Sequence, residues 1–242
     1  MSATGHLVPS HFSLPVAVLA GGKGTRLGAR VRDVPKPLVE VAGEPFLFHS
    51  LRRLATSGVR RVVLCVGYLG ERIEDVVGYR SFGMDVSYSY DGPGLDGTLG
   101  ALRRACDLLG DRFLVVYGDT ILTLDYRDLV AAWDRSGLPA IMAVLKNGGR
   151  WGPSNTLVRE GLVEAHDKVA PTAAMTWIDY GAGGLTGEAL GELGPTDTDL
   201  STLYATLAAQ GLLAAYPVSK RFYEIGTPAS LAETEAYLAN RA

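Results

Sequence analysis

The sequence predicts a doubly wound α/β fold with a mostly parallel sheet. Short apolar runs that fit buried strands alternate with amphipathic segments that fit helices, a pattern typical of βαβ units. Glycine, with 30 residues, recurs at the junctions between these segments. A chain of 242 residues buries roughly 70–75% of its unfolded surface, so the core needs no disulfide or structural metal. Cys65 and Cys106 lie in apolar segments without metal-ligand spacing, and we expect both in the core.

In the first half, each apolar run is expected to form a strand and each amphipathic segment a helix that ends near a glycine. The predicted strands cover residues 16–20, 39–41, 61–66, 85–90 and 113–117. The predicted helices lie between Pro45 and Gly58, between Leu69 and Gly78, and over residues 97–109. Asp125 is expected to cap a further helix that begins at Tyr126.

The second half has a less regular pattern, with short apolar runs separated by glycines. The predicted strands cover 140–145, 155–159, 162–165, 175–180 and 213–218, and the predicted helices cover 200–209 and 228–240. Residues 1–14 are expected to form a flexible tail, because they are polar and lack periodicity. We therefore expect one domain over 15–242, with a regular half at about 15–145 and a smaller, β-rich half at about 146–242 that covers the substrate.

Charge and hydropathy limit the partners. The net charge of −3 argues against a broad surface for nucleic acid or anionic membrane. No apolar stretch approaches the roughly 20 residues that span a bilayer, and the N-terminus lacks the basic start and apolar core of a signal peptide. The sequence therefore predicts a cytoplasmic protein without nucleic-acid or membrane partners.

A glycine-rich loop follows the first predicted strand. Gly21, Gly22 and Gly24 fall within four residues, with Lys23 and Arg26 among them. Glycines let backbone N–H groups wrap an anion closely, and the two cations add attraction. The loop matches neither a Walker A motif nor the dinucleotide fingerprint, because Leu27 occupies the place of the third glycine. We therefore expect a phosphate-bearing ligand held in another manner.

Two further residues are expected at the same place. Lys36 lies between Pro35 and Pro37, so we expect it on a stiff, non-helical loop that aims its ammonium group. Asp119 follows a predicted buried strand, and Gly118 before it is expected to permit close approach of a ligand. Ligands of open α/β sheets bind outside the carboxyl ends of the strands. A carboxylate there fits Mg²⁺, which takes one or two carboxylates plus phosphate oxygens, although a turn or cap aspartate is the alternative.

The segment from Leu19 to Leu27, followed by Pro35-Lys-Pro-Leu38, closely resembles the signature of sugar-1-phosphate nucleotidyltransferases. The resemblance implies a Rossmann-like, GT-A-like fold. It also implies that Arg26 holds the triphosphate, that Lys36 bridges phosphates around the reacting centre, and that Asp119 binds Mg²⁺. These three would be the catalytic residues. The implied nucleotide-binding residues are Leu19, Ala20, Gly21, Gly22, Lys23, Gly24, Thr25, Arg26, Gly97 and Thr98, the last two from a loop that resembles the one bordering the base and ribose.

Two segments of the second half extend the resemblance. Tyr223-Glu-Ile-Gly-Thr-Pro228 is similar to the family's Asp-Ile-Gly-Thr-Pro segment, whose acid is the second metal ligand. Glu224 stands in its place, so direct and water-mediated metal contact both stay open. The D-glycero-D-manno-heptose 1-phosphate guanylyltransferase branch offers the closest pattern. It implies that Lys168 contacts the sugar phosphate, and that the remaining sugar-binding residues are Asn155, Asp179, Tyr180 and Gly181. Gly183 and Gly184 depart from that branch.

The resemblance implies an enzyme that joins a nucleoside triphosphate, with GTP favoured, to a sugar 1-phosphate such as a manno-heptose 1-phosphate. It implies a nucleotide-binding half at 15–145 and a sugar-phosphate-binding half at 146–242. Alternatives stay open: glucose, mannose or N-acetylmuramate (MurNAc) 1-phosphate, phosphocholine, or a non-catalytic regulatory subunit that binds nucleotide. A dinucleotide oxidoreductase is a more distant alternative. The base, the sugar and the formation of a homo-oligomer do not follow from the residues.

Overall fold

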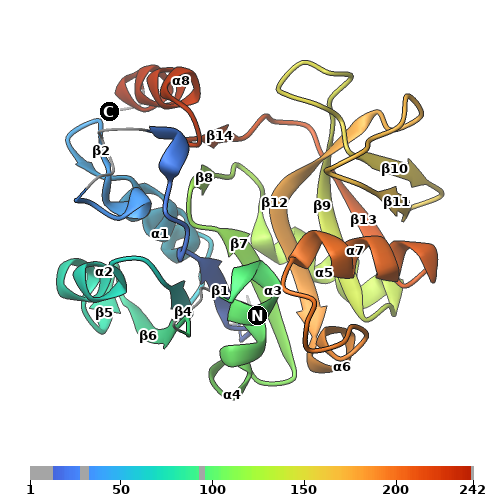
Figure 1. Ribbon diagram of the computed structural model, residues 1–242, viewed down its shortest axis with the longest axis horizontal. Helices are drawn as coiled ribbons and strands as arrows, with labels where there is room; N and C mark the ends of the chain where they lie inside the picture. The colour runs from blue at the N-terminus through green and yellow to red at the C-terminus, as the bar shows by residue number, and fades with distance from the viewer. Residues whose placement is uncertain (1–12, 28–32, 93–95, 241–242) are drawn as a thin grey trace, which may run out of the picture.

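The computed structural model describes residues 13–27, 33–92 and 96–240, which form an α/β fold around one central sheet (Figure 1). The predicted tail over 1–14 lies almost wholly outside the described residues. Ten of the described strands form the sheet, in the order β10-β11-β13-β9-β12-β7-β1-β4-β6-β5. Two smaller pairs, β14 with β8 and β2 with β3, lie beside it.

The strands are β1 Val16–Leu19, β2 Glu40–Val41, β3 Glu44–Pro45, β4 Arg61–Val66, β5 Arg80–Ser81, β6 Met84–Tyr90, β7 Arg112–Tyr117, β8 Thr120–Ile121, β9 Ala140–Lys146, β10 Thr156–Arg159, β11 Leu162–His166, β12 Trp177–Thr186, β13 Leu213–Val218 and β14 Tyr223–Glu224. The α-helices are α1 Phe46–Thr56, α2 Gly70–Val77, α3 Gly97–Arg104, α4 Cys106–Leu109, α5 Tyr126–Ser136, α6 Gly187–Leu190, α7 Leu200–Ala209 and α8 Pro228–Ala239. A 3-10 helix, η2, covers Lys36–Leu38.

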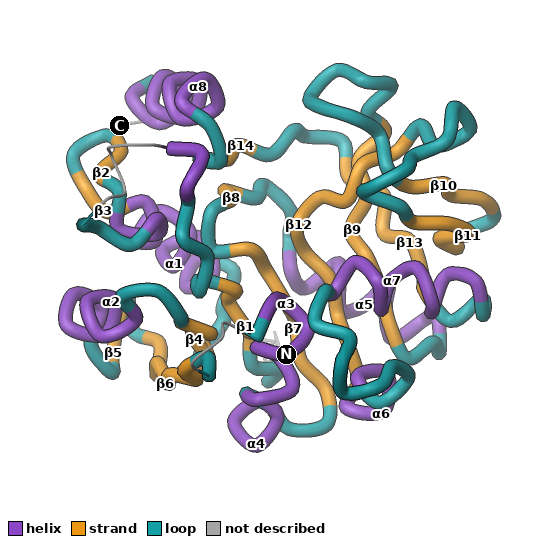
Figure 2. The backbone as a smooth tube through the Cα atoms, in the orientation of Figure 1, coloured by secondary structure: helices purple, strands orange, loops and turns teal. Residues whose placement is uncertain are grey.

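The parallel sheet predicted for the first half is confirmed. Strand β1 pairs in parallel with β4 and β7, and β4 with β6. Val16, Ala17 and Val18 are almost fully buried, as expected of a strand covered on both faces. Helices α1, α2 and α5 pack on one face through residues such as Leu51, and α3, α6 and α7 pack on the other through residues such as Leu203 (Figure 2). The fold is therefore doubly wound.

The second half continues the same sheet with a different pairing. Strand β12 lies antiparallel between β7 and β9, and the hairpin of β10 and β11 forms the far edge, whereas β9 and β13 are parallel. The complete sheet is therefore mixed, and parallel pairing prevails only in its first half. Gly183 and Gly184 allow β12 to lie between β7 and β9, because neighbouring side chains leave no space for a Cβ at either position. A Cβ at Gly183 would lie 2.6 Å from the Tyr204 hydroxyl oxygen, and one at Gly184 would lie 2.5 Å from the Trp133 ring.

Several local predictions are refined by the structure. Asp125 caps α5 as predicted, since its carboxylate accepts a hydrogen bond of 2.8 Å from Arg127 N. The helix predicted over 97–109 is divided at Ala105 into α3 and α4. Strand β12 is longer than predicted, because its glycines continue the strand to Thr186. The pairs formed by two-residue strands, such as β8 with β14, have no periodicity to predict them.

Candidate active site

Two neighbouring cavities open at the carboxyl ends of the parallel strands. The first, of about 360 Å³, lies against the glycine loop after β1. The second, of about 740 Å³, lies over β12 and the segment around β14. Arg26 and Tyr117 border both cavities, so the two spaces meet at these side chains.

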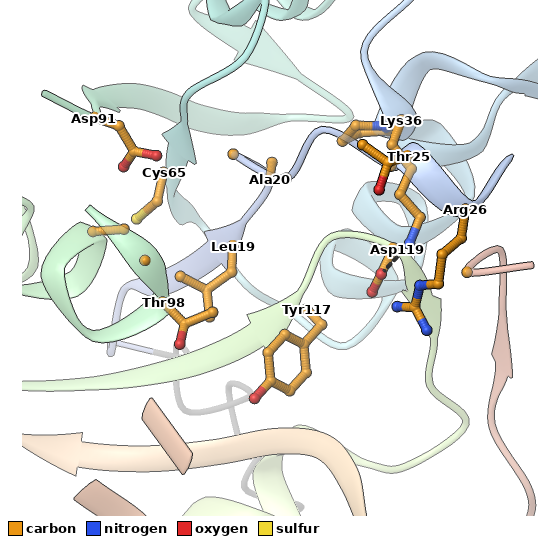
Figure 3. Close-up of a pocket in the computed structure, with 17 residues that line it drawn as sticks. Leu19, Ala20, Thr25, Arg26, Lys36, Cys65, Asp91, Thr98, Tyr117 and Asp119 are labelled. Carbon is orange, nitrogen blue, oxygen red and sulfur yellow. Dashed lines mark hydrogen bonds and ion pairs between the residues drawn. The ribbon is translucent and has the colours of Figure 1, made fainter. Parts of the chain in front are cut away.

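The glycine loop lines the first cavity as predicted. Among the predicted nucleotide-binding residues, those at this cavity are Leu19, Ala20, Gly21, Gly22, Gly24, Thr25, Arg26, Gly97 and Thr98. Lys23 is exposed and does not line it. Arg26, Lys36 and Asp119 lie together at one end of the cavity, and Asp91, Cys65 and Thr98 lie at the other (Figure 3). The end with Arg26 and Lys36 carries the positive charge that attracts phosphates.

Lys36 and Asp119 form an ion pair at the charged end. Lys36 Nζ lies 2.5 Å from Asp119 Oδ2, and the lysine is only 7% exposed. The prediction that Lys36 is not helical is wrong, because it opens the 3-10 helix η2, where Leu38 N donates to Pro35 O at 2.8 Å. Prolines fit this first turn, since its N–H groups need no partner within the helix. Gly24 faces the lysine stem, and a Cβ there would lie 2.9 Å from Lys36 Cβ.

Asp119 is positioned by the segments on both sides of it. Its Oδ1 accepts a hydrogen bond of 3.1 Å from Thr120 Oγ1, and its backbone carbonyl accepts one of 3.1 Å from Ile225 N. Gly118 serves packing, in contrast to the predicted approach of a ligand, because a Cβ there would lie 2.9 Å from Leu19 O of the neighbouring strand.

Glu224 lies close to Asp119 in the fold, but its carboxylate contacts a different group and borders a different cavity. Strands β8 and β14 bring Glu224 opposite Thr120. The Glu224 carboxylate accepts a hydrogen bond of 2.5 Å from Gly226 N and borders the second cavity, whereas Asp119 borders the first. Within residues 13–27, 33–92 and 96–240, no group of three or more His, Cys, Asp or Glu side chains could by itself hold a metal ion. A single carboxylate such as Asp119 would bind Mg²⁺ together with water molecules and phosphate oxygens.

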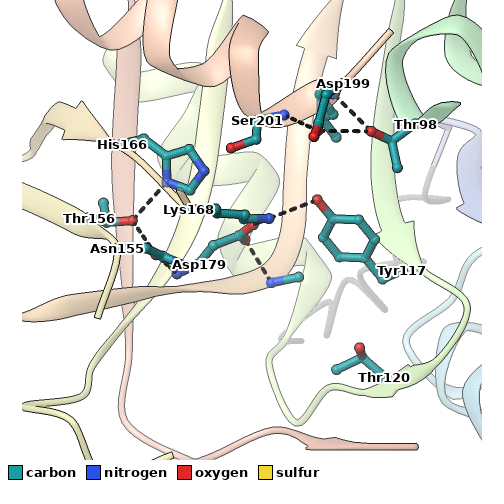
Figure 4. A network of polar contacts seen from close by, with 12 residues as sticks. Thr98, Tyr117, Thr120, Asn155, Thr156, His166, Lys168, Asp179, Asp199 and Ser201 are labelled. Carbon is teal, nitrogen blue, oxygen red and sulfur yellow. Dashed lines mark hydrogen bonds and ion pairs between the residues drawn. The ribbon is translucent and has the colours of Figure 1, made fainter. Parts of the chain in front are cut away.

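The second cavity contains the predicted sugar-phosphate-binding residues, and Lys168 and Asp179 form its central ion pair (Figure 4). Lys168 Nζ lies 2.8 Å from Asp179 Oδ2 and donates a hydrogen bond of 3.3 Å to the Tyr117 hydroxyl. Burial acts to lower the pKa of Lys168, but Asp179 and Tyr117 outweigh it and the pKa is raised. Burial acts to raise the pKa of Asp179, and Lys168 outweighs it, so that pKa is lowered. Both groups are therefore charged at neutral pH.

The other predicted residues of this cavity have mainly structural contacts. Asn155 Oδ1 accepts from Asp179 N at 3.0 Å and from Thr156 Oγ1 at 2.9 Å. Tyr180 is 1% exposed, and its hydroxyl accepts a hydrogen bond of 3.0 Å from Thr123 N. Tyr180 thus borders the cavity, but its hydroxyl points away toward Thr123. Gly181 also lies at the cavity, with a φ of 87° that favours glycine.

Sequence reasoning missed several residues at the two cavities. Asp91, Cys65 and Tyr117 border the first cavity, and Arg150, Trp151 and Arg221 border the second. Burial raises the pKa of Asp91 and raises that of Cys65 to about 12. Asp91 follows β6 at its carboxyl end, a position that could have marked it in the same way as Asp119. Arg150 and Trp151 lie in an irregular turn after β9, and no local pattern distinguishes them.

Comparison with solved structures gives the same fold over nearly the whole chain. A crystal structure of HddC from Yersinia pseudotuberculosis complexed with GMP-PN has a TM-score of 0.78 and 24% identity, covering 93% of this chain and 99% of that one. A putative glucose-1-phosphate thymidylyltransferase from Bacillus anthracis, in complex with a sucrose, has a TM-score of 0.80 and 20% identity, covering 93% and 95%. These similarities confirm the α/β fold.

Curated relatives match somewhat less than half of the chain. N-acetylmuramate alpha-1-phosphate uridylyltransferase of Neisseria meningitidis serogroup B is 38% identical over 111 residues, which are 45% of this chain and 48% of that protein. D-glycero-alpha-D-manno-heptose 1-phosphate guanylyltransferase of Aneurinibacillus thermoaerophilus is 34% identical over 113 residues, 46% of this chain and 49% of that protein. The chain thus spans about half the length of these relatives.

A protein-family model covers more of the chain than these relatives do. The model described as the MobA-like NTP transferase domain matches residues 16–183, from β1 to within β12. The matched range includes the glycine loop, Lys36, Asp119, Lys168 and Asp179. The resemblance to sugar-1-phosphate nucleotidyltransferases is thereby confirmed at the level of the family. The chain belongs to the family of the MobA-like NTP transferase domain.

Proposed function

We propose that this protein transfers a nucleotidyl group from a nucleoside triphosphate to a sugar 1-phosphate, which yields a nucleoside diphosphate sugar and pyrophosphate. The observation that carries the proposal is the meeting of two cavities at Arg26 and Tyr117, with Lys36 and Asp119 beside the junction. One cavity would hold the triphosphate and the other the sugar phosphate. The two reacting phosphates would then meet at the shared wall.

In this reaction the protein would contribute mainly by positioning the two substrates and by stabilising negative charge. An oxygen of the sugar phosphate forms a bond to the α-phosphorus, and the bond from that phosphorus to the bridging oxygen of pyrophosphate breaks in line with it. The attacking phosphate is already anionic near neutral pH, so no general base is needed. Arg26 and Lys36 would offset the negative charge on the triphosphate, which is the main contribution of the protein in phosphoryl-type transfer.

The site also fits a divalent cation bound together with the nucleotide. Asp119 lines the first cavity, and its side chain is 35% exposed, so its carboxylate can be reached from there. We propose that Asp119 holds Mg²⁺ with phosphate oxygens of the nucleotide, and that the ion supplies charge neutralisation when bound. Glu224 would support this region through its bond to Gly226 N. A direct or water-mediated contact of Glu224 with the metal remains the sequence-based prediction.

The proposed substrates are GTP and a manno-heptose 1-phosphate. A heptose 1-phosphate guanylyltransferase among the relatives and the HddC structure with GMP-PN support this choice. The uridylyltransferase for N-acetylmuramate 1-phosphate and the mannose-1-phosphate guanylyltransferases among the relatives favour other pairs. The experiment is a screen for pyrophosphate with four ribonucleoside triphosphates and dTTP against heptose, mannose, glucose and MurNAc 1-phosphates and phosphocholine.

A non-catalytic nucleotide-binding subunit is the second candidate function. Glu224 is the observation that favours it, because its carboxylate already accepts a hydrogen bond from Gly226 N and borders the second cavity, whereas Asp119 borders the first. The same screen separates the two candidates. Pyrophosphate formation that requires both substrates supports the transferase. Nucleotide binding without pyrophosphate formation for any pair would favour the regulatory subunit.

A further inference from the structure

Tyr117 forms part of the wall between the two cavities (Figures 3 and 4). It is the last residue of β7, and its ring packs against the backbone of β12 at Gly181, where a Cβ would lie 3.1 Å from Tyr117 Cδ2. Glycine at that position therefore makes room for the ring. The strand end and the β12 contact fix the ring, so its hydroxyl has a defined position.

Lys168 has one N–H donor to spare beside this hydroxyl. A lysine ammonium carries three N–H donors. The ammonium nitrogen lies 2.8 Å from Asp179 Oδ2 in an ion pair, and one N–H is donated to the Tyr117 hydroxyl at 3.3 Å. Among the residues that the structure describes, Lys168 has no third hydrogen-bond acceptor. The side chain is 36% exposed at the second cavity, so the third donor can face a ligand there.

The Tyr117 hydroxyl also has a hydrogen to donate. It accepts from Lys168, and in the described part of the chain it has no acceptor of its own. Burial, followed by the nearby charge of Asp179, raises the pKa of Tyr117 to about 12. The hydroxyl therefore keeps its proton at neutral pH. A neutral O–H and an ammonium N–H side by side form a pair of donors, the arrangement that binds two oxygens of one phosphate.

We propose that the Tyr117 hydroxyl and the third N–H of Lys168 together bind the phosphate of the sugar 1-phosphate at the junction of the cavities. This inference rests on the proposed function. Tyr117 is then a catalytic residue, because it touches the attacking phosphate and holds it beside the nucleotide cavity that its ring also borders. Asp179 acts one step further away as a positioning residue, since it fixes the ammonium group of Lys168.

The test compares Tyr117→Phe with Tyr126→Phe. Tyr126 is also buried, at 4% exposure, but it lies in α5 and borders neither cavity. Isothermal titration with α-D-mannose 1-phosphate, and with D-mannose as the sugar without phosphate, measures the gain in affinity from the phosphate. We expect the same gain in affinity in the unmodified protein and in Tyr126→Phe. In Tyr117→Phe we expect the gain to be about tenfold smaller, which is the usual effect of losing one hydrogen bond to a charged group. Affinity for GTP should stay within about twofold.

A second pair of variants keeps the test decisive if Tyr117→Phe does not fold. Tyr117→Gln places an amide donor on a side chain of about the same size as the apolar one in Tyr117→Leu. We expect the gain in affinity from the phosphate to be at least about threefold larger in Tyr117→Gln than in Tyr117→Leu. Equal gains for these two variants, or an unchanged gain in Tyr117→Phe, would overturn the assignment of Tyr117. Failure of the proposed function would instead be the absence of pyrophosphate for every substrate pair in the unmodified protein.

Discussion

Lys36 Nζ lies 2.5 Å from Asp119 Oδ2, so the lysine of the Pro-Lys-Pro segment and the carboxylate after β7 form an ion pair although 83 positions separate them in the sequence. The pair lies at the charged end of the first cavity, close to the junction with the second. The arrangement places a positive and a negative group where a metal-bound triphosphate would need both. Removing either partner should therefore affect catalysis more than folding.

Replacement of Asp119 tests the acidic partner. Asp119→Asn keeps the size of the side chain and removes its charge, so we expect turnover to fall at least about 100-fold with the fold intact. The measurement is steady-state pyrophosphate release, with circular dichroism to monitor the fold. Asp85→Asn is the control, because Asp85 forms an exposed ion pair with Arg80 and borders neither cavity. Near-normal turnover in Asp119→Asn would contradict the role of this carboxylate.

Replacement of Lys36 tests the basic partner. Lys36→Met retains the apolar stem that packs by Gly24 but removes the ammonium group. We expect a loss of turnover of about 100-fold or more, since a preorganised charge next to the reacting phosphates is removed. Thermal unfolding should change little by comparison. A variant with full turnover would exclude Lys36 from the reacting centre.

Gly24 should be required for the shape of the loop. Its φ is 65°, and a Cβ would lie 2.9 Å from Lys36 Cβ. Gly24→Ala should therefore destabilise the protein by roughly 1–2 kcal/mol in urea unfolding and displace Lys36. Gly22→Ala is the matched control for stability, because a Cβ at Gly22 would meet no heavy atom of the described residues within 4 Å, apart from its chain neighbours. Equal stabilities of the two variants would refute the packing argument.

Glu224 can be compared with Asp119 through metal dependence. Its carboxylate is engaged with Gly226 N and faces the second cavity. We therefore expect Glu224→Gln to change the Mg²⁺ concentration for half-maximal rate much less than Asp119→Asn does. The measurement is a Mg²⁺ titration of pyrophosphate release. A larger shift in Glu224→Gln than in Asp119→Asn would mean that Glu224 is the principal metal ligand.

The ion pair of Lys168 and Asp179 predicts a pH dependence of stability. The pKa of Asp179 is lowered in the folded chain, so its stabilisation is present above the unfolded pKa of about 3.9 and is lost as pH falls through the folded value. The pKa of Lys168 is raised, so its contribution is full below an unfolded pKa of about 10.4 and is lost only at higher pH. Both contributions are thus present around pH 7.

Asp179→Asn should show this dependence directly. It leaves Lys168 without its counter-ion, and we expect a loss of about 2 kcal/mol, below the roughly 3–5 for a fully buried pair because Lys168 is 36% exposed. Urea unfolding as a function of pH is the measurement. The difference from the unmodified protein should shrink below about pH 4. A difference that stays constant down to pH 2 would show that charge is not its cause.

Local patterns predicted most of the first half of the chain. The apolar run at Val16–Leu19 and the glycines after it belong to one continuous segment, so a strand and a ligand-lining loop could be predicted together. Asp125 could be predicted as a cap for the same reason, because its partner Arg127 N is two residues away. Parallel pairing followed from the alternation of strands and helices.

Relationships between distant segments could not be predicted in this way. In the sequence, the glycines of β12 predict the end of a strand. In the structure they lie in a central strand, because the side chains of Trp133 and Tyr204 pack against opposite faces of it and leave no room for a Cβ. Tyr117 reads as an ordinary strand residue, and its place between two cavities depends on β12 and on Lys168. Arg221 and Trp151 share a cavity through the fold alone.

The most direct test of the two-cavity account uses a sugar 1-phosphate that carries ¹⁸O at its three non-bridging phosphate oxygens, with unlabelled nucleoside triphosphate and Mg²⁺. Mass spectrometry then locates the label. If the sugar phosphate attacks the α-phosphorus, all three labels appear in the nucleoside diphosphate sugar and the pyrophosphate carries none. Labelled pyrophosphate, or nucleotide hydrolysis that proceeds without the sugar phosphate, would contradict the account.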